Sequence, residues 1–139
     1  MREILFRGQT RRKGERIINV RGDKCDSNWV YGGIFPQNNG GDFAIIYQQT
    51  PEIKKYTVYA DTVGQYTGLT DKNGVKIFEG DIVRAITHST DIYVEAITFE
   101  NGAFWYKNWS WLKFRFKFEN VEVIGNIYDN PELIEAKDD

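Results

Sequence analysis

The chain of 139 residues contains one cysteine, one histidine and three prolines, and it has no long apolar run. Because Cys25 is the only cysteine, it cannot form an internal disulfide, which favours a reducing compartment. No stretch approaches the roughly 20 apolar residues that cross a membrane. Residues 1–8 lack the apolar segment of a signal peptide. The sequence therefore predicts a cytoplasmic protein with no membrane contact.

The scarcity of histidine and cysteine also limits the available chemistry. His88 lies in a polar stretch, and neither it nor Cys25 has the partners of a nucleophilic site. A zinc site built from these two residues would need two carboxylates, an uncommon ligand set. We therefore predict no catalytic residues, no metal and no cofactor. An enzyme with a carboxylate-only site is the alternative from a different class.

Acidic residues cluster between positions 61 and 81, and a metal site or an acid/base pair is one interpretation of them. The stretch Asp71-Lys-Asn-Gly74 lacks the glycine spacing and the twelfth-position glutamate of a calcium loop. Short acids next to glycines more often bind backbone amides in turns. Of the four acids Asp61, Asp71, Glu79 and Asp81, we predict that Asp71 stabilises a turn and that Glu79 and Asp81 bind loop amides.

Charge is low overall but unevenly distributed. The formal net charge is −2, which argues against a protein that is basic over its whole surface. Residues 1–24 nevertheless carry eight Lys/Arg against three Asp/Glu, and residues 129–139 carry five acids against one lysine. Local basic surfaces are therefore expected.

The sequence is rich in aromatic and β-branched residues, with four Trp, eight Tyr and nine Phe. This composition favours β structure. Short apolar stretches bounded by polar loops predict strands rather than helices. The expected strands are Glu3–Arg7, Arg16–Val20, Asn28–Phe35, Phe43–Gln48, Tyr56–Tyr59, Ile92–Phe99, Ala103–Lys107, Leu112–Phe118 and Val121–Tyr128, with a bulge at Gly125.

Turn signals organise the second half. Asn73-Gly74 and Asn101-Gly102 predict two-residue hairpin turns with both residues at positive φ. The sequence Gly80-Asp-Ile-Val83 is typical of the entry into the first long strand of an SH3-like barrel, predicted over residues 76–128. Pro131–Ala136 is expected to form one or two helical turns.

Four segments together resemble the YopX family, whose members are encoded mostly by phages and prophages. The first two are Arg2-Glu-Ile-Leu-Phe-Arg7 and Trp29-Val-Tyr-Gly32. The others are Asp61–Val83 and Val123-Ile-Gly-Asn-Ile-Tyr-Asp-Asn-Pro-Glu-Leu133. The resemblance implies an all-β fold that includes an SH3-like barrel, and it implies no particular activity. We expect a single domain with four parts: an N-terminal β lobe (1–60), a connector (61–75), the barrel portion (76–128) and an acidic tail (129–139).

The stretch Trp105–Lys117 interleaves aromatic and basic residues, as surfaces for single-stranded nucleic acid do. The ordinary interpretation is a solvent-facing side of a β-sheet whose tryptophans belong to the core. A turn near Asn108–Ser110 would also break the shared face. The candidate nucleic-acid-binding residues are Trp109, Trp111, Lys113, Arg115 and Lys117.

Tyr66, between Gly64 and Gly68, is a candidate contact for a phage or host protein, and its structural alternative is a buried corner. We therefore predict a non-enzymatic phage or prophage accessory protein whose β-barrel binds a macromolecule, with weak nucleic-acid binding favoured. The alternative within binding is protein–protein assembly, including a homo-oligomer.

Overall fold

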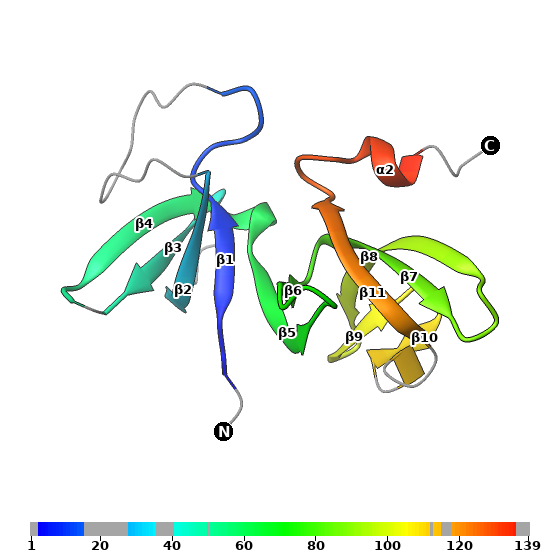
Figure 1. The fold of residues 1–139 in the computed structure, drawn as a ribbon. Helices are drawn as coiled ribbons and strands as arrows, with labels where there is room; N and C mark the ends of the chain where they lie inside the picture. The colour runs from blue at the N-terminus through cyan, green and yellow to red at the C-terminus, as the bar shows by residue number, and fades with distance from the viewer. Residues whose placement is uncertain are drawn as a thin grey trace. The chain divides into compact units, whose positions relative to one another are not determined.

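The computed structural model describes residues 3–15, 28–35, 41–49, 51–111, 113–114 and 118–135. The chain divides into two compact units, Met1–Tyr66 and Thr67–Asp139 (Figure 1). The division falls inside the predicted connector. The strand predicted at Arg16–Val20 and the cysteine Cys25 lie outside the described residues.

The architecture is all-β, as the composition predicted, with two antiparallel sheets. The first has the strand order β4-β3-β2-β1-β5-β6 and the second β10-β9-β8-β7-β11. The short helical elements are η1 (Ala60–Thr62) and α2 (Glu132–Glu135), the latter within the predicted C-terminal helical segment. The strands are β1 (Phe6–Gln9), β2 (Trp29–Phe35), β3 (Phe43–Gln48), β4 (Lys54–Tyr59), β5 (Gly64–Thr70), β6 (Lys76–Phe78), β7 (Asp81–Thr87), β8 (Ile92–Glu100), β9 (Ala103–Tyr106), β10 (Trp109–Ser110) and β11 (Phe118–Asn126).

The first unit buries one face of its sheet. Successive side chains of a strand point to opposite faces, so every second residue enters the core. On β3 these are Ala44 and Ile46, and on β4 they are Tyr56 and Val58. Val30 of β2 completes this cluster. The residues between them therefore point to the opposite face.

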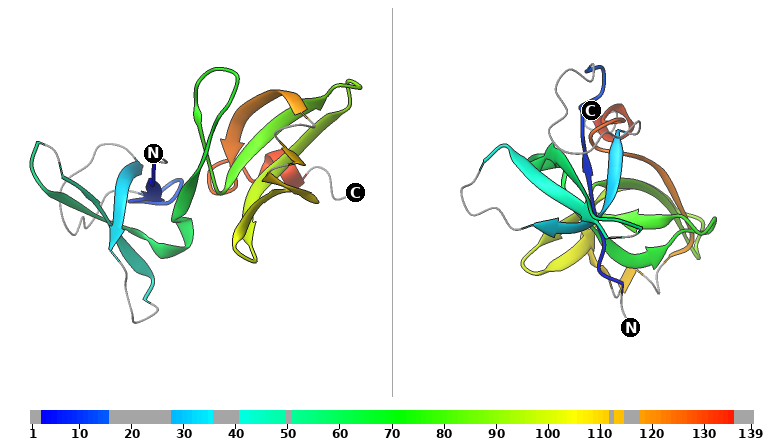
Figure 2. Two further views of the ribbon diagram at one scale, coloured as in Figure 1. Left: turned by 90° about the horizontal axis from the view of Figure 1, so that it is seen from below. Right: turned by 90° about the vertical axis from the view of Figure 1, so that its left-hand side faces the viewer.

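The second unit is built around β7, which pairs with β8 on one side and β11 on the other (Figure 2). Its core is aromatic: Tyr106 is fully buried, and Phe114 and Phe118 pack beside it. The register of β11 shifts between Val123 and Gly125, so the predicted irregularity at Gly125 is confirmed. The sheet order is open, with β10 and β11 at its ends, and no pairing in the described residues closes it into a barrel.

The structure confirms the prediction for one Asn-Gly turn and contradicts part of the prediction for the other. Asn101 and Gly102 have φ of 54° and 78°, so the predicted pair of positive φ values is confirmed. At the other turn only Gly74 has positive φ, at 81°, and the prediction for Asn73 is wrong. The Asp71 amide donates to the Val75 carbonyl, so three residues form this loop, with glycine at the left-handed position.

A second three-residue loop joins β7 and β8 and places a threonine where the first has glycine. The Thr87 amide donates to the Asp91 carbonyl, and Thr90 has φ of 69°. The left-handed region is strained for a β-branched residue. Thr90→Gly is therefore expected to raise the free energy of unfolding by about 1 kcal/mol, measured by urea denaturation.

The control for this prediction is Ser89→Gly. Ser89 is not among the described residues with positive φ, so glycine there only increases the freedom of the unfolded chain. It should lower the stability slightly. If both glycine variants were destabilised, strain at Thr90 would be excluded.

The strand predicted over Leu112–Phe118 is wrong for its first half. Trp111, Lys113 and Phe114 are helical, and only Phe118 begins a strand. Phe114 and Phe118 are nevertheless buried and Lys113 is exposed, as predicted. Both rings reach the same core, Phe114 from a helical residue and Phe118 from the start of a strand. The other residues of this segment, Leu112, Arg115, Phe116 and Lys117, lie outside the described residues.

Candidate functional site

The candidate site is the outer face of the first unit's sheet, defined here as the side chains of β2, β3 and β4 that point away from the core. The register places Phe43 opposite Tyr59 and Tyr47 opposite Lys55. It also places Phe35 opposite Ile45. The alternation that buries Ile46 and Val58 thus brings these residues together on the other side.

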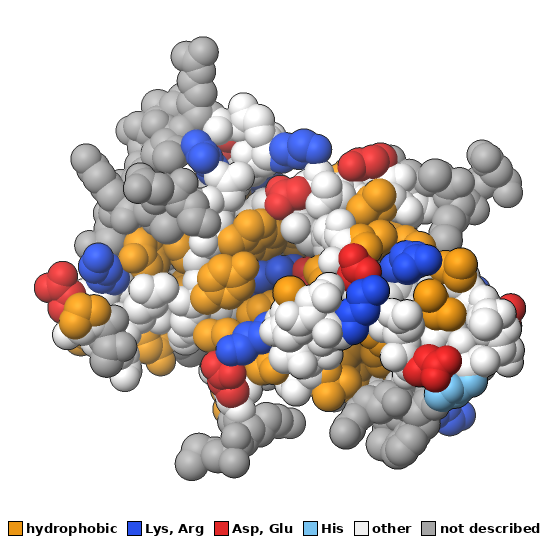
Figure 3. Space-filling view, in the orientation of Figure 1, with side chains coloured by type: hydrophobic (Ala, Val, Ile, Leu, Met, Phe, Trp, Pro, Cys, Tyr) orange, Lys and Arg blue, Asp and Glu red, His pale blue; other side chains and the backbone are white. Residues whose placement is uncertain are grey.

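This face is unusually aromatic for a surface that water contacts. The exposed fractions are 43% for Tyr31, 41% for Phe35 and 47% for Phe43. Solvent faces of antiparallel sheets are normally polar. Neighbouring exposed apolar side chains mark surfaces that bind something. In Figure 3, hydrophobic and basic side chains lie side by side on the surface over β3 and β4.

The rings are arranged in cross-strand pairs. The Phe35 and Tyr47 ring centroids are 4.7 Å apart, and those of Phe43 and Tyr59 are 5.3 Å apart. Gly33 makes the first pair possible, because a Cβ there would lie 2.4 Å from Cζ of Tyr47. The missing side chain lets the Tyr47 ring lie across β2.

Two cations lie against these rings. Lys55 Nζ is 5.4 Å from the Phe35 ring centroid, and the Arg12 guanidinium carbon is 4.1 Å from that of Tyr59. Both distances are in the range of cation–π contacts. The face therefore combines ring surfaces with positive charge.

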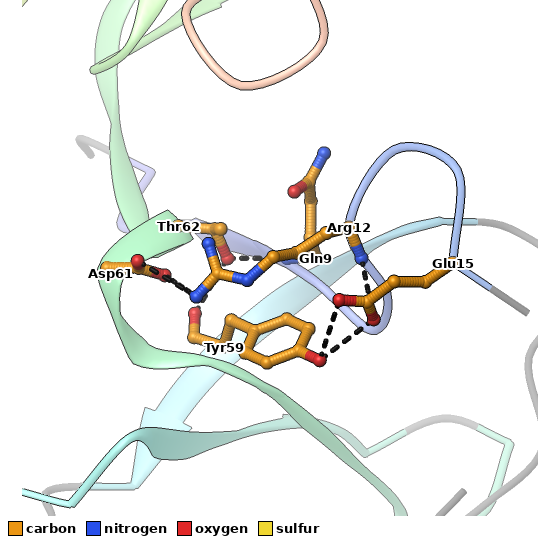
Figure 4. Close-up of polar contacts among 6 residues, drawn as sticks. All are labelled: Gln9, Arg12, Glu15, Tyr59, Asp61 and Thr62. Atoms are coloured by element: carbon orange, nitrogen blue, oxygen red, sulfur yellow. Dashed lines mark hydrogen bonds and ion pairs between the residues drawn. The ribbon is translucent and has the colours of Figure 1, made fainter. Parts of the chain in front are cut away.

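Arg12 is held in place by several contacts (Figure 4). One terminal nitrogen of its guanidinium donates to both Asp61 carboxylate oxygens, at 3.0 and 3.2 Å. The Tyr59 hydroxyl donates to Glu15 at 2.8 Å. The hydrogen bond to Asp61 raises the pKa of Arg12, and the hydrogen bond to Glu15 raises that of Tyr59. These exposed groups remain protonated at neutral pH, and Arg12 keeps its charge beside the ring.

The buried residue Thr62 supports this arrangement through two hydrogen bonds. The Thr62 hydroxyl donates to the Tyr59 carbonyl at 2.7 Å and accepts the Gln9 amide at 2.9 Å. It thereby ties η1 to β1.

The sequence alone did not identify this site. The available signal was the alternation in Phe43–Gln48 and Lys54–Tyr59, which puts aromatic residues on both sides of the strands.

The described residues among those predicted to bind nucleic acid, Trp109, Trp111 and Lys113, do not share a strand face. Lys107 and Asn108 make a turn between β9 and β10, which breaks the register. The Trp109 ring packs on Tyr93, Tyr106 and Phe118, and the Trp111 ring stacks on Phe114 with an interplanar angle of 2°. Lys113 is exposed, and Arg115 and Lys117 lie outside the described residues.

Tyr66, the candidate protein contact, has an exposed fraction of only 9%. Its backbone amide donates to the Leu5 carbonyl. A partner would reach little of this ring. The burial agrees better with the structural alternative.

The clustered acids follow the structural prediction where their contacts are described. Asp81 accepts the Phe78 amide at 2.7 Å, and Asp71 accepts three backbone amides. Asp61 forms an ion pair with Arg12. His88 pairs with Glu119 on the surface. The described residues contain no group of three side chains suited to a metal ion.

The fold and the outer face define a two-unit, all-β protein with an exposed aromatic and basic surface. The chain belongs to the YopX family, because the family model described as YopX protein matches residues 21–135. None of its described helices is long and apolar enough to cross a membrane.

One solved structure is similar over nearly the whole chain. It is described as the crystal structure of protein EF1440 from Enterococcus faecalis. The identity is 25% and the TM-score 0.55, with 96% of this chain and 99% of that chain covered. No curated protein matches the sequence.

The segments that carry the family resemblance have backbone roles in this structure. Gly68, Gly74 and Gly80 all have positive φ. Near the other end, the Asn126 side chain accepts the amides of Tyr128 and Asp129. These residues fix turns, whereas the family segment Trp29-Val-Tyr-Gly32 places Tyr31 on the outer face.

Proposed function

We propose that this protein is a non-enzymatic accessory protein of a phage or prophage that binds nucleic acid weakly and without base choice, through its first unit. The observation that supports this most directly is the pairing of cations with aromatic rings on one open sheet face. Such pairings are what nucleic-acid surfaces use, since cations neutralise phosphates while rings contact bases. The lone cysteine favours action in the cytoplasm.

The distribution of charge between the units supports the same assignment. By sequence, the first unit has ten Lys/Arg and seven Asp/Glu, a formal charge of +3. The second has eight Lys/Arg and thirteen Asp/Glu, a charge of −5. A polyanion is attracted to the first and repelled by the second. For this reason we favour the first unit over the segment that ends at Lys117.

Nucleic-acid binding predicts a steep dependence on salt, because each neutralised phosphate of a single strand releases counterions. Lys55→Ser should flatten the plot of log affinity against log salt by up to about 0.7, which corresponds to one phosphate contact. The measurement is fluorescence anisotropy of a labelled oligonucleotide. Lys55 is exposed near the start of β4.

The matched control removes cations from the second unit: Lys113, Arg115 and Lys117 to Ser. It should leave the slope unchanged. A flatter slope in this control with no change in the Lys55→Ser variant would place the site in the second unit. Absence of binding by the wild type at low salt would refute the proposed function.

We also propose that the second unit is an SH3-like barrel. Two features support this: five short antiparallel strands in the order β10-β9-β8-β7-β11, and an aromatic core enclosed by them. An experimental structure in which β11 and β10 share a closed layer around Tyr106 would test it. A flat, open sheet would contradict it.

Protein–protein assembly is the second candidate. The observation in its favour is the exposed apolar surface of Tyr31, Phe35 and Phe43 next to the sheet edge at β4. Sedimentation analysis of the purified protein tests it. A dimer that dissociates when these rings are removed would favour assembly.

A further inference from the structure

The outer face has three exposed rings that the core does not require. Tyr31, Phe35 and Phe43 point away from the buried cluster of the first unit. Each still has between 41% and 47% of its surface exposed. Burying such rings against a ligand would remove more apolar surface from water. The rings are therefore available to a ligand with flat apolar surfaces.

Lys55 and Arg12 restrict what that ligand can be. Both cations lie next to rings of this face, and the whole unit carries a charge of +3. Two acids make described contacts here: Asp61 accepts from Arg12, and Glu15 accepts from the Tyr59 hydroxyl. A purely apolar partner would cover both cations and cost them hydration without adding an ionic contact to either. A ligand that offers flat rings and negative charges in alternation satisfies both groups.

We propose that the outer face is a binding site for single-stranded nucleic acid, in which bases stack on Tyr31, Phe35 and Phe43 while Lys55 and Arg12 contact phosphates. This assignment rests on the proposed function and adds the site and the form of the ligand. A duplex keeps its bases stacked on one another, so their faces cannot reach the rings. An unpaired strand exposes every base face.

The spacing of the rings also determines whether affinity depends on the base sequence of the bound nucleic acid. Phe43 and Tyr47 are four residues apart on β3, so their Cα atoms are separated by about 13 Å. Each belongs to a different cross-strand ring pair. Stacking on separate rings uses a face that all bases have, so we expect affinity without base choice.

The test compares ring-deletion variants in an anisotropy titration with a labelled oligothymidylate of about 15 nucleotides, a length within the site size of such modules. Phe35→Ala and Phe43→Ala should each weaken binding at least about fivefold, and the double variant about 25-fold. The control is Phe99→Ala, since Phe99 is 44% exposed on β8 of the second unit. This control should bind like the wild type. An unlabelled duplex should compete far less well than an unlabelled single strand.

A second measurement needs no substitution and covers the case in which a variant folds poorly. Ultraviolet cross-linking of the wild type to an oligonucleotide containing bromodeoxyuridine, followed by mass spectrometry, should label residues 29–35 and 43–47. Cross-links confined to residues 67–139 would overturn the proposal.

The outcomes separate this inference from the proposed function. If the wild type binds neither single strand nor duplex at about 20 mM salt, both fail. If it binds duplex as tightly as single strand, and the double variant binds like the wild type, the proposed function stands and the site assignment fails. A protein that forms a dimer dissociated by Phe35→Ala and Phe43→Ala, and that binds no oligonucleotide, would assign the face to self-association.

Discussion

Replacing Asp71 with alanine is expected to lower the free energy of unfolding of the second unit by about 3–5 kcal/mol. One carboxylate oxygen accepts the amides of Asn73 and Val75 at 2.8 and 2.9 Å. The other accepts the amide of Val123, 52 positions along the chain, at 3.0 Å. The side chain therefore joins the loop between β5 and β6 to β11. Its removal leaves three backbone donors without their acceptor.

Urea denaturation measures this effect, and Asp91→Ala is the matched control. Asp91 directly follows the other three-residue loop, and its amide rather than its carboxylate donates to the Thr87 hydroxyl. The control should stay within about 0.5 kcal/mol of the wild type. Equal stability of both variants would show that the carboxylate of Asp71 is not a structural acceptor.

The contribution of Asp71 should also depend on pH. Burial raises the pKa of this carboxyl, but the hydrogen bonds from the amides of Val123, Val75 and Asn73 outweigh burial and lower it below its ordinary value. A carboxyl with a lowered pKa in the folded state stabilises the fold above its unfolded pKa, and this stabilisation is lost as the pH falls through the folded pKa. The difference in stability between wild type and Asp71→Ala should therefore shrink below about pH 4.

Tyr106→Ala should cost about 4 kcal/mol, because the ring is fully buried at the centre of the second unit. It packs against the rings of Trp109, Phe114 and Phe118, with centroids 6.2, 4.8 and 5.4 Å away. Deleting it leaves a cavity among rigid side chains that cannot all move into the space. Thermal and urea unfolding followed by tryptophan fluorescence report the loss directly.

Tyr106→Phe separates the ring from the hydroxyl. The hydroxyl donates to the Val83 carbonyl at 2.8 Å, so its removal should cost only about 1 kcal/mol. Burial raises the pKa of Tyr106, and the neighbouring Glu95 charge raises it further. A raised pKa gives stability that is complete below the unfolded value and is lost as the pH rises. The wild type should therefore lose stability above about pH 10 more steeply than Tyr106→Phe. Parallel alkaline curves would contradict this account.

One strand and one turn show how far the local sequence pattern determines structure. Phe43–Gln48 was predicted with the bounds it has, and the Asn101-Gly102 turn has the expected backbone. Both depend on interactions within a few residues: side-chain alternation in one case and two adjacent positive φ angles in the other. Propensity and turn chemistry act over that range.

The segment after Ser110 shows where local pattern fails. Its alternating phenylalanines predicted a strand, but Lys113 and Phe114 are helical. The rings of Phe114 and Phe118 reach the same core around Tyr106, and contact with that core outweighs strand propensity. Similarly, Trp109 and Trp111 were predicted to contact a ligand, and the structure uses their rings for packing against other aromatic residues.

The sequence by itself determined the all-β class, the family, the Asn101-Gly102 turn and the acceptor roles of Asp71 and Asp81, because composition, turn chemistry and motif order are properties of neighbouring residues. Only the tertiary structure decided which aromatic rings enter a core and which remain at the surface. That choice depends on strand register: Phe35, Phe43 and Tyr59 come from three separate strands. Pairing between distant segments sets the register, and a shift of one residue would exchange the outer face with the core.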